Sequence, residues 1–118
     1  MIWAKIGSLV MFAGVALGAF GAHALRSRLN DHYTEVYKTA VSCHLIHGLA
    51  LFVIAWVSQI ATNSKADLSG IFLFSGIILF SGSLYALCLT GQKWLGMITP
   101  LGGLCFLIGW FLLFLAVR

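Results

Sequence analysis

The sequence predicts an all-α integral membrane protein built as a four-helix transmembrane bundle. Of its 118 residues, 61% are hydrophobic and only 8% are charged, and the mean hydropathy is +1.02. So few polar residues cannot give a water-soluble domain a normal polar surface. The apolar residues also fall into four long runs, which we place at residues 2–24, 40–61, 68–89 and 95–117. We expect them to form a single transmembrane domain over residues 1–118.

Each run is long enough to cross a bilayer. A helix of about 22 residues, rising 1.5 Å per residue, measures about 33 Å. The hydrocarbon core of a bilayer is about 30 Å thick, so each helix can span it with a modest tilt. Four crossings return the chain to the side where it began, and both termini are therefore expected on the same side of the membrane.

The first run carries glycines at helical spacing. Gly7, Gly14, Gly18 and Gly21 share one face, and Gly14 with Gly18 forms a G-x-x-x-G unit. Glycine is frequent in membrane helices generally. Four on one face nevertheless favour a strip that lets another backbone approach closely. We expect Gly14, Gly18 and Gly21 to pack against a second helix.

The connection between the first two runs, residues 26–39, is the longest and most charged. Asn30 or Asp31 can cap a helix, and Glu35 with Lys38 forms an i,i+3 pair. The tyrosines of this connection suit the headgroup region of a membrane. We expect a short interfacial helix here that leads into the second span.

The second run carries a polar stripe that contains His44 and His47. On a helix these histidines share a face with tyrosines and small residues, whereas the opposite face holds large apolar side chains. This pattern is typical of a membrane helix with protein on one side and lipid on the other. The polar face comprises Tyr33, Tyr37, Ala40, His44, His47, Leu51, Ala55 and Ser58.

The third and fourth runs continue the pattern of small and polar residues. In the third run, Gly82 and Ser83 share a face with other small residues. In the fourth, Thr99 precedes the only proline, so we expect Thr99 to cap a helix that begins at Pro100, after a short preceding piece. Small residues at helical spacing predict packing seams on both helices. The glycines expected to pack in these two runs are Gly82, Gly102 and Gly109.

Alternating helices bring polar residues of several runs to one side of the membrane. The candidate polar pocket comprises His23, His44, His47, Ser81, Ser83 and Tyr85. Ionisable side chains inside a membrane are costly and by default mark a ligand, ion or proton site. Alternatively, the histidines hydrogen-bond to Ser83, Tyr85 or backbone carbonyls and hold the helices in register. Both interpretations stay open for His47, the second is favoured for His44, and a solvated or capping role is favoured for His23.

Other classes of function find little support. The net charge of +4 is spread over short connections, so no nucleic-acid partner is expected. Cys43, Cys88 and Cys105 stand singly in apolar runs, which indicates neither a disulfide framework nor a zinc site. No carboxylate lies at the depth of the histidines, so we predict no metal and no cofactor. No catalytic motif is present, so we predict no catalytic residue and no enzyme.

Four ordered motifs carry a resemblance to a known family: GAFGAHAL (18–25), TAVSCHLIHGLAL (39–51), FSGSLYAL (80–87) and TPLGGLCFLIGW (99–110). Together they resemble the small bacterial inner-membrane proteins grouped as domain-of-unknown-function family 423, which has mitochondrial relatives in animals. The resemblance implies four spans and no established activity. It maps the family's signature residues onto His23, His47, Ser81, Gly82, Ser83, Tyr85, Pro100, Gly102, Gly103 and Trp110.

Two functions are consistent with these features. The first is a structural or accessory membrane protein that packs through small-residue helix faces, either with itself or with a larger membrane complex. The second is a ligand-, ion- or proton-binding or transport protein that uses the polar pocket. In both cases we expect a multi-pass protein of the bacterial inner (plasma) membrane, in contact with the lipid bilayer. Basic residues divide too evenly between the two sides to predict the orientation.

Overall fold

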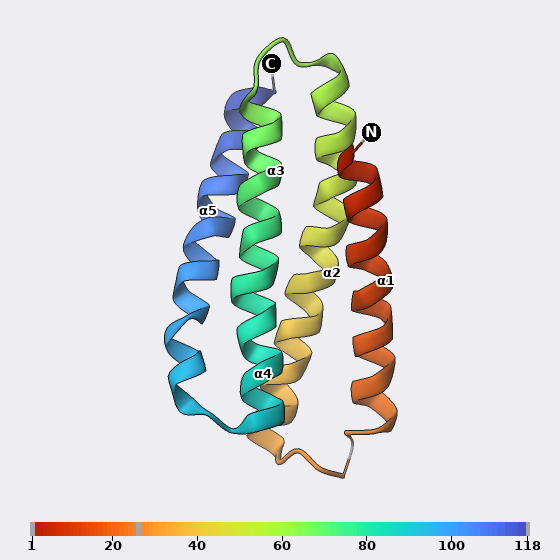
Figure 1. The fold of residues 1–118 in the computed structure, drawn as a ribbon, viewed down its shortest axis with the longest axis vertical. Coiled ribbons are helices and arrows are strands. Elements are labelled where there is room, and N and C mark those ends of the chain that lie inside the picture. The colour runs from red at the N-terminus through yellow and green to blue at the C-terminus, as the bar shows by residue number, and fades with distance from the viewer. Residues whose placement is uncertain (1, 26, 118) are drawn as a thin grey trace.

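The computed structural model describes residues 2–25 and 27–117, which form four helical rods (Figure 1). Two rods are single helices, and the other two are each assembled from shorter pieces. All four are long and apolar enough to cross a membrane, as the sequence predicts. The elements are α1 (Ile2–His23), α2 (Asp31–Ile60), a third rod of α3 (Lys65–Gly76), η1 (Ile77–Ser81) and α4 (Gly82–Thr90), and a fourth rod of η2 (Lys93–Met97) and α5 (Thr99–Ala116).

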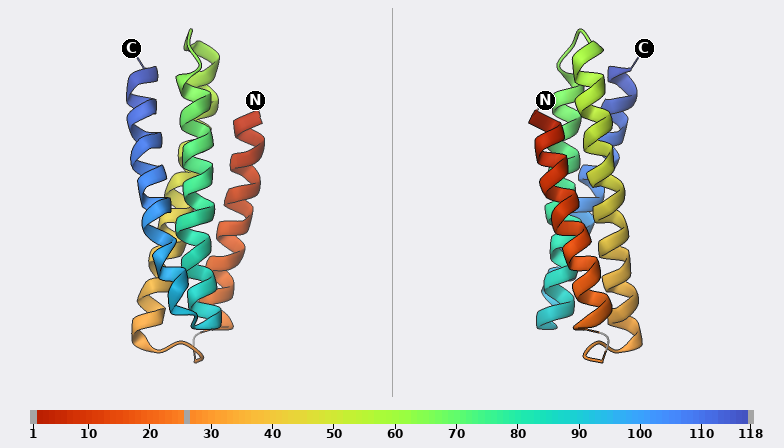
Figure 2. Two further views of the ribbon diagram at one scale, coloured as in Figure 1. Left: turned by 60° about the vertical axis from the view of Figure 1, so that its left-hand side comes forward. Right: turned by 90° about the vertical axis from the view of Figure 1, so that its right-hand side faces the viewer.

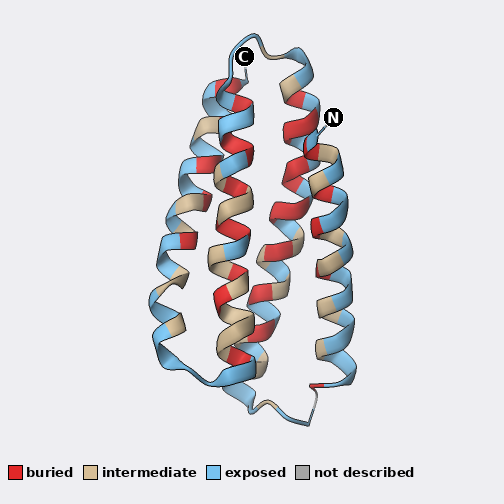
Figure 3. Cartoon of the chain, in the orientation of Figure 1, coloured by how far each residue is buried: buried red, intermediate tan, exposed pale blue. Residues whose placement is uncertain are grey.

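The rods run alternately up and down, so both ends of the chain lie at the same end of the bundle (Figures 1 and 2). α2 and α3 occupy the middle, α1 packs on α2, and α5 packs on α3. Half of the most apolar stretch of α2 is buried, against 22% of the corresponding stretches of α1 and of the rod that ends in α5. Figure 3 shows this difference as buried residues gathered on the central helices. The outer helices therefore turn most of their surface away from the bundle.

The apolar core lies between the central helices. Leu51 and Ile54 of α2 and Leu73 of α3 are completely buried there. Large apolar side chains also cover the outside, among them Phe12 of α1 and Leu107 of α5, which are 75% and 70% exposed. An apolar exterior is what a bilayer requires, because lipid rather than water surrounds it.

α2 begins well before the apolar run that predicted it. Asn30 caps the helix, since its side chain accepts a hydrogen bond from the backbone N–H of Tyr33 at 2.7 Å. The helix then continues unbroken to Ile60. The expected short interfacial helix is therefore not a separate element but the first turns of α2. No glycine or proline occurs between residues 31 and 47 to separate the two.

The third rod contains a π-helical turn, η1, that the sequence did not predict. A π turn accommodates an extra residue and so changes the direction in which the following side chains point. In this rod, Ser81 faces α2, where its hydroxyl donates to the carbonyl of Ala40, while Ser83 faces Thr99 at the start of α5. The π turn therefore lies where the third rod contacts both neighbours.

The expected cap at the start of α5 was wrong. Ile98 occupies the capping position, and no side chain bonds to the free backbone groups there. The hydroxyl of Thr99 instead lies 2.6 Å from that of Ser83 on the third rod. A short helical piece does precede α5, as expected, in the form of the 3₁₀ helix η2.

Most of the glycines expected to pack do lie against a neighbouring helix. A methyl group added at Gly21 would overlap the ring of Tyr37, and one added at Gly14 would lie 2.7 Å from Leu45. Gly109 is similarly close to Leu73, and Gly102 to the backbone of Phe80, whereas Gly18 makes only an ordinary contact with Val41. These close approaches are the role that small residues play in membrane helices.

Gly82 is the exception, because among the described residues it packs against no other helix of this chain. A methyl group there would meet no atom within 4 Å outside its own helix. The residues on either side, Ser81 and Ser83, are turned toward α2 and α5. With successive residues about 100° apart around a helix, Gly82 is left facing away from both neighbours.

Candidate functional site

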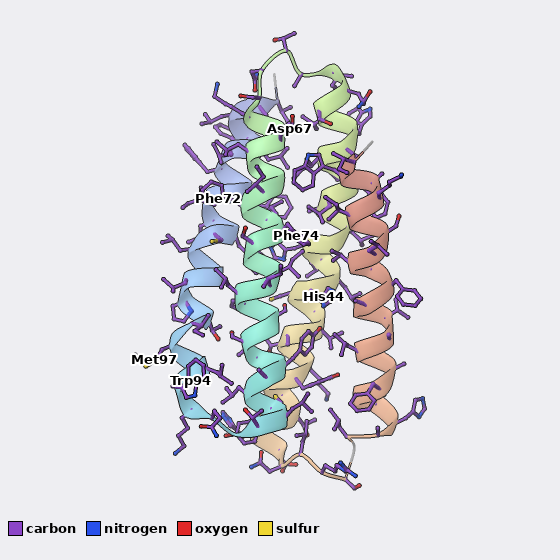
Figure 4. The ribbon with its side chains drawn as sticks, in the orientation of Figure 1. His44, Asp67, Phe72, Phe74, Trp94 and Met97 are labelled. Carbon is purple, nitrogen blue, oxygen red and sulfur yellow. The ribbon has the colours of Figure 1, made fainter. Side chains whose placement is uncertain are left out.

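Apart from His23, the predicted polar residues lie within the bundle as separate hydrogen-bonded contacts and not as one pocket. His44 is placed near the middle of the bundle's length, between the ribbons (Figure 4). Its exposed fraction is 5%, and that of His47 is 9%. Ser81 and Ser83 are buried as well. Each of these side chains has its own partner on a neighbouring helix or on its own helix.

His44 connects three rods. Its Nε2 lies 2.8 Å from the carbonyl oxygen of Val10 on α1, and its Nδ1 lies 2.9 Å from the hydroxyl of Tyr85 on α4. A carbonyl oxygen can only accept a hydrogen bond, so Nε2 carries the hydrogen. Nδ1 of the neutral imidazole is then the acceptor, and the Tyr85 hydroxyl donates to it. The ring passes beside Gly14, where a side chain would crowd it.

In His47 the two ring nitrogens have the reverse roles, so that Nδ1 donates and Nε2 accepts. Its Nδ1 lies 2.7 Å from the carbonyl of Cys43 and so donates to it. Its Nε2 lies 3.0 Å from the indole nitrogen of Trp110 on α5, and because an indole N–H can only donate, Nε2 accepts. The ring also stacks on Phe106, with centroids 3.6 Å apart and planes within 10°. His47 therefore joins α2 to α5.

These bonds limit the chemistry available to both histidines. Metal ligation and proton uptake each need an imidazole lone pair, and in both rings that lone pair already accepts a hydrogen bond. Adding a proton to Nε2 of His47 would set two N–H groups against each other, since Trp110 cannot turn to accept. In this arrangement each histidine links α2 to a neighbouring helix.

The two serines of the third rod have equally specific partners. Ser81 is completely buried and donates to the carbonyl of Ala40 at 2.8 Å. Ser83 shares a hydrogen bond with Thr99 and also donates to the carbonyl of Phe80 in its own rod, at 2.9 Å. The first contact ties the third rod to α2, and the second ties it to α5.

His23 does not join this group, and its exposed position agrees with the solvated or capping role that the sequence favoured over a place in the pocket. It lies exposed at the end of α1. His44 instead contacts α1 at Val10, thirteen residues or about 20 Å away along the helix axis. The early start of α2 explains the difference, because His44 lies several turns into the helix rather than near its beginning.

Several partners of the polar residues were not predicted from the sequence. Trp110 and Phe106 were not assigned to the histidine contact. In the other half of the bundle, Ser69 donates to the carbonyl of Gly109 at 2.6 Å, and the indole of Trp3 donates to Asp67 at 2.9 Å. The signal for Phe106 was present, because Gly102, Phe106, Gly109 and Leu113 recur at intervals of three and four and are all buried.

In the described part of the chain, residues 2–25 and 27–117, no buried polar side-chain atom lacks a hydrogen-bond partner. In the same ranges no three His, Cys, Asp or Glu side chains are grouped as metal ligands. The structure has a groove of about 600 Å³ between α1 and α2 and a second of about 300 Å³ at the opposite end, and none of the candidate pocket residues lines either one.

We predict that His44 and Tyr85 are energetically coupled. Replacing His44 with leucine or Tyr85 with phenylalanine each removes the bond between them, so the double variant is expected to lose less stability than the two single losses combined. The coupling energy should be about 1 kcal/mol, as for other hydrogen bonds between membrane helices. Reversible unfolding of the four proteins in the same detergent micelles measures it. Strictly additive losses would contradict the contact.

The comparisons with known proteins agree on one class of protein. A family model described as "Protein of unknown function (DUF423)" matches residues 17–103. A UPF0382 membrane protein of Staphylococcus aureus is 46% identical over 111 residues, covering 94% of this chain and 90% of the relative. The UPF0382 membrane protein YwdK of Bacillus subtilis is 42% identical over 112 residues, covering 94% of this chain and 91% of YwdK. No solved structure matches.

Proposed function

The chain belongs to the DUF423 family and is a multi-pass protein of the bacterial plasma membrane. From this premise we propose that it is a non-enzymatic structural or accessory component that acts through contacts with other proteins in the bilayer. Neither the family description nor the names of the relatives indicate an activity. The proposal therefore rests on what the bundle offers chemically.

One observation carries the proposal: the polar groups of the interior are used up in holding the helices together. His44 bonds to α1 and α4, His47 to α5, Ser81 to α2 and Ser69 to α5. A transport or catalytic site needs polar groups that are free to meet a substrate. Groups that bond only to one another stabilise one helix arrangement, which is the property of a scaffold.

The outer helices supply the surface for such contacts. α1 and α5 are mostly unburied, and they do not cover each other because α2 and α3 lie between them. Their exteriors carry large apolar side chains such as Phe12 and Leu107. These faces are therefore available to a second copy of the chain or to another membrane protein.

The alternative, a ligand-, ion- or proton-binding or transport protein, is not favoured. It requires an accessible cavity at the histidines, and neither His44 nor His47 lines either of the two grooves described above. It also requires an imidazole lone pair that is free, whereas those of His44 and His47 accept hydrogen bonds from Tyr85 and Trp110. The histidines are better explained as connectors.

Photo-crosslinking inside native membranes tests the proposal. A photoreactive amino acid at Phe12 reports on α1, and one at Leu107 reports on α5, because both positions point outward. We expect at least one of them to give a discrete protein adduct, while the same probe at the fully buried Leu73 gives none. Native mass spectrometry in mild detergent then identifies the partner as a second copy or another protein. Monomer alone, with only lipid adducts at both outer positions, would contradict the proposal.

A further inference from the structure

A groove of about 600 Å³ lies between α1 and the first half of α2. It opens outward, because Ala22 on one wall and Lys38 and Ser42 on the other are not buried by the bundle. Its α1 wall is made of small residues, including Gly18 and Gly21. The groove is therefore mostly apolar and open toward the lipid side of the bundle.

The length of α2 places this groove at the membrane surface. α2 has 30 residues and so measures about 45 Å, some 15 Å more than a hydrocarbon core. The excess must lie at its N-terminal end, since Asp31, Glu35 and Lys38 are there and residues 39–60 carry no carboxylate, lysine or arginine. Thr34 and Lys38 then lie at headgroup level, and Ser42 lies just inside the hydrocarbon region.

Hydrogen-bond donors line one wall of the groove at this depth. Thr34, Lys38 and Ser42 are four residues apart, which aligns them along one face of α2. Neither hydroxyl forms a hydrogen bond with the described part of the chain, although Ser42 lies at a depth where water is scarce. Lys38 pairs only with Glu35, at 3.4 Å, and both side chains are largely exposed. Such surface pairs are weak, so the ammonium group is available to another anion.

We propose that this groove binds one anionic phospholipid. The phosphate lies against Lys38 and the Thr34 hydroxyl, and one acyl chain runs down the groove past Gly18 and Val41 toward the middle of the bilayer. Among the described residues, the lining includes a lysine and no carboxylate. The groove is polar at its headgroup end and apolar deeper in the membrane, which matches a ligand with a charged head and an apolar tail.

Native mass spectrometry of the full chain in mild detergent tests the site, with phosphatidylglycerol and phosphatidylcholine of identical acyl chains as probes. We expect phosphatidylglycerol to be retained and phosphatidylcholine to be lost at the same collision energy. Lys38→Gln should weaken retention about fivefold, the effect of one basic charge near an anionic surface. Gly18→Leu, which fills the groove, should abolish it. The matched control is Lys65→Gln, which removes an exposed basic residue at the other end of the bundle.

Three results would overturn the proposal. Equal retention of the two lipids would show that the groove does not select a charge. An equal loss in Lys65→Gln would show that net charge alone is responsible. Displacement of the lipid by inorganic phosphate would indicate a free-phosphate site in place of a lipid site. The melting temperature of Lys38→Gln in detergent is expected to match that of the unaltered protein, so that weaker retention does not reflect unfolding.

Discussion

Replacing Gly102 with alanine is expected to destabilise the folded protein by about 3 kcal/mol, the upper range for overpacking a tightly packed site. A methyl group at residue 102 would overlap the backbone nitrogen and Cα of Phe80. A side chain in that place could move aside, but the backbone of the π turn cannot do so without shifting the third rod. Thermal unfolding in a fixed detergent, followed by tryptophan fluorescence, measures the loss.

The adjacent glycine provides the matched control. Gly103→Ala makes the same chemical change in the same turn of α5, but a methyl group there would lie 3.9 Å from the Phe80 ring, an ordinary contact. Both changes gain the same helix propensity, so the difference between them isolates the contact with Phe80. Gly82→Ala, with no atom within 4 Å, should also be tolerated. Equal losses at residues 102 and 103 would contradict this packing of α5 on the third rod.

The four spans could be predicted because a bilayer imposes a length and a composition that appear directly in the sequence. An apolar run near 22 residues is rarely anything but a membrane span, and alternating crossings then determine which helix ends lie together. The start of α2 could not be placed this way. Residues 31–39 are polar and yet belong to the helix. Hydropathy shows where the lipid-facing stretch begins, whereas a helix continues until a residue breaks it.

The partners of the polar residues could not be predicted, because they depend on the rotation of each helix about its axis. On α5 the sequence assigned only Gly102 and Gly109 to a packing face, whereas Phe106 is buried on that face as well. The π turn changes the rotation again, partway along the third rod. Regular helical spacing therefore predicted Gly82 on a packing face, whereas in the structure it faces away from α2 and α5.

Replacing His47 with alanine is expected to cost about 3 kcal/mol, comparable to truncating a large buried side chain. The change removes the stacking on Phe106 and leaves a void between α2 and α5. It also deprives the Trp110 indole of its acceptor. Thermal unfolding in the same detergent measures the loss, and His47→Phe separates its parts. A phenylalanine ring can keep the stacking but loses the hydrogen bonds to Trp110 and to the Cys43 carbonyl, so His47→Phe should cost about 2 kcal/mol, about 1 kcal/mol for each bond.

Trp110→Phe removes the same hydrogen bond from the other side and so distinguishes a connector from a binding site. If His47 serves to hold α5, the double variant should lose less stability than the two single phenylalanine variants combined, by about the 1 kcal/mol of the bond that joins the two residues. A proton or ligand site predicts another pattern. His47→Phe would then abolish a cellular phenotype while stability stayed unchanged, and Trp110→Phe would leave that phenotype intact because the imidazole is still present. The first pattern would show that His47 stabilises the helix arrangement, and the second would show that it forms a proton or ligand site.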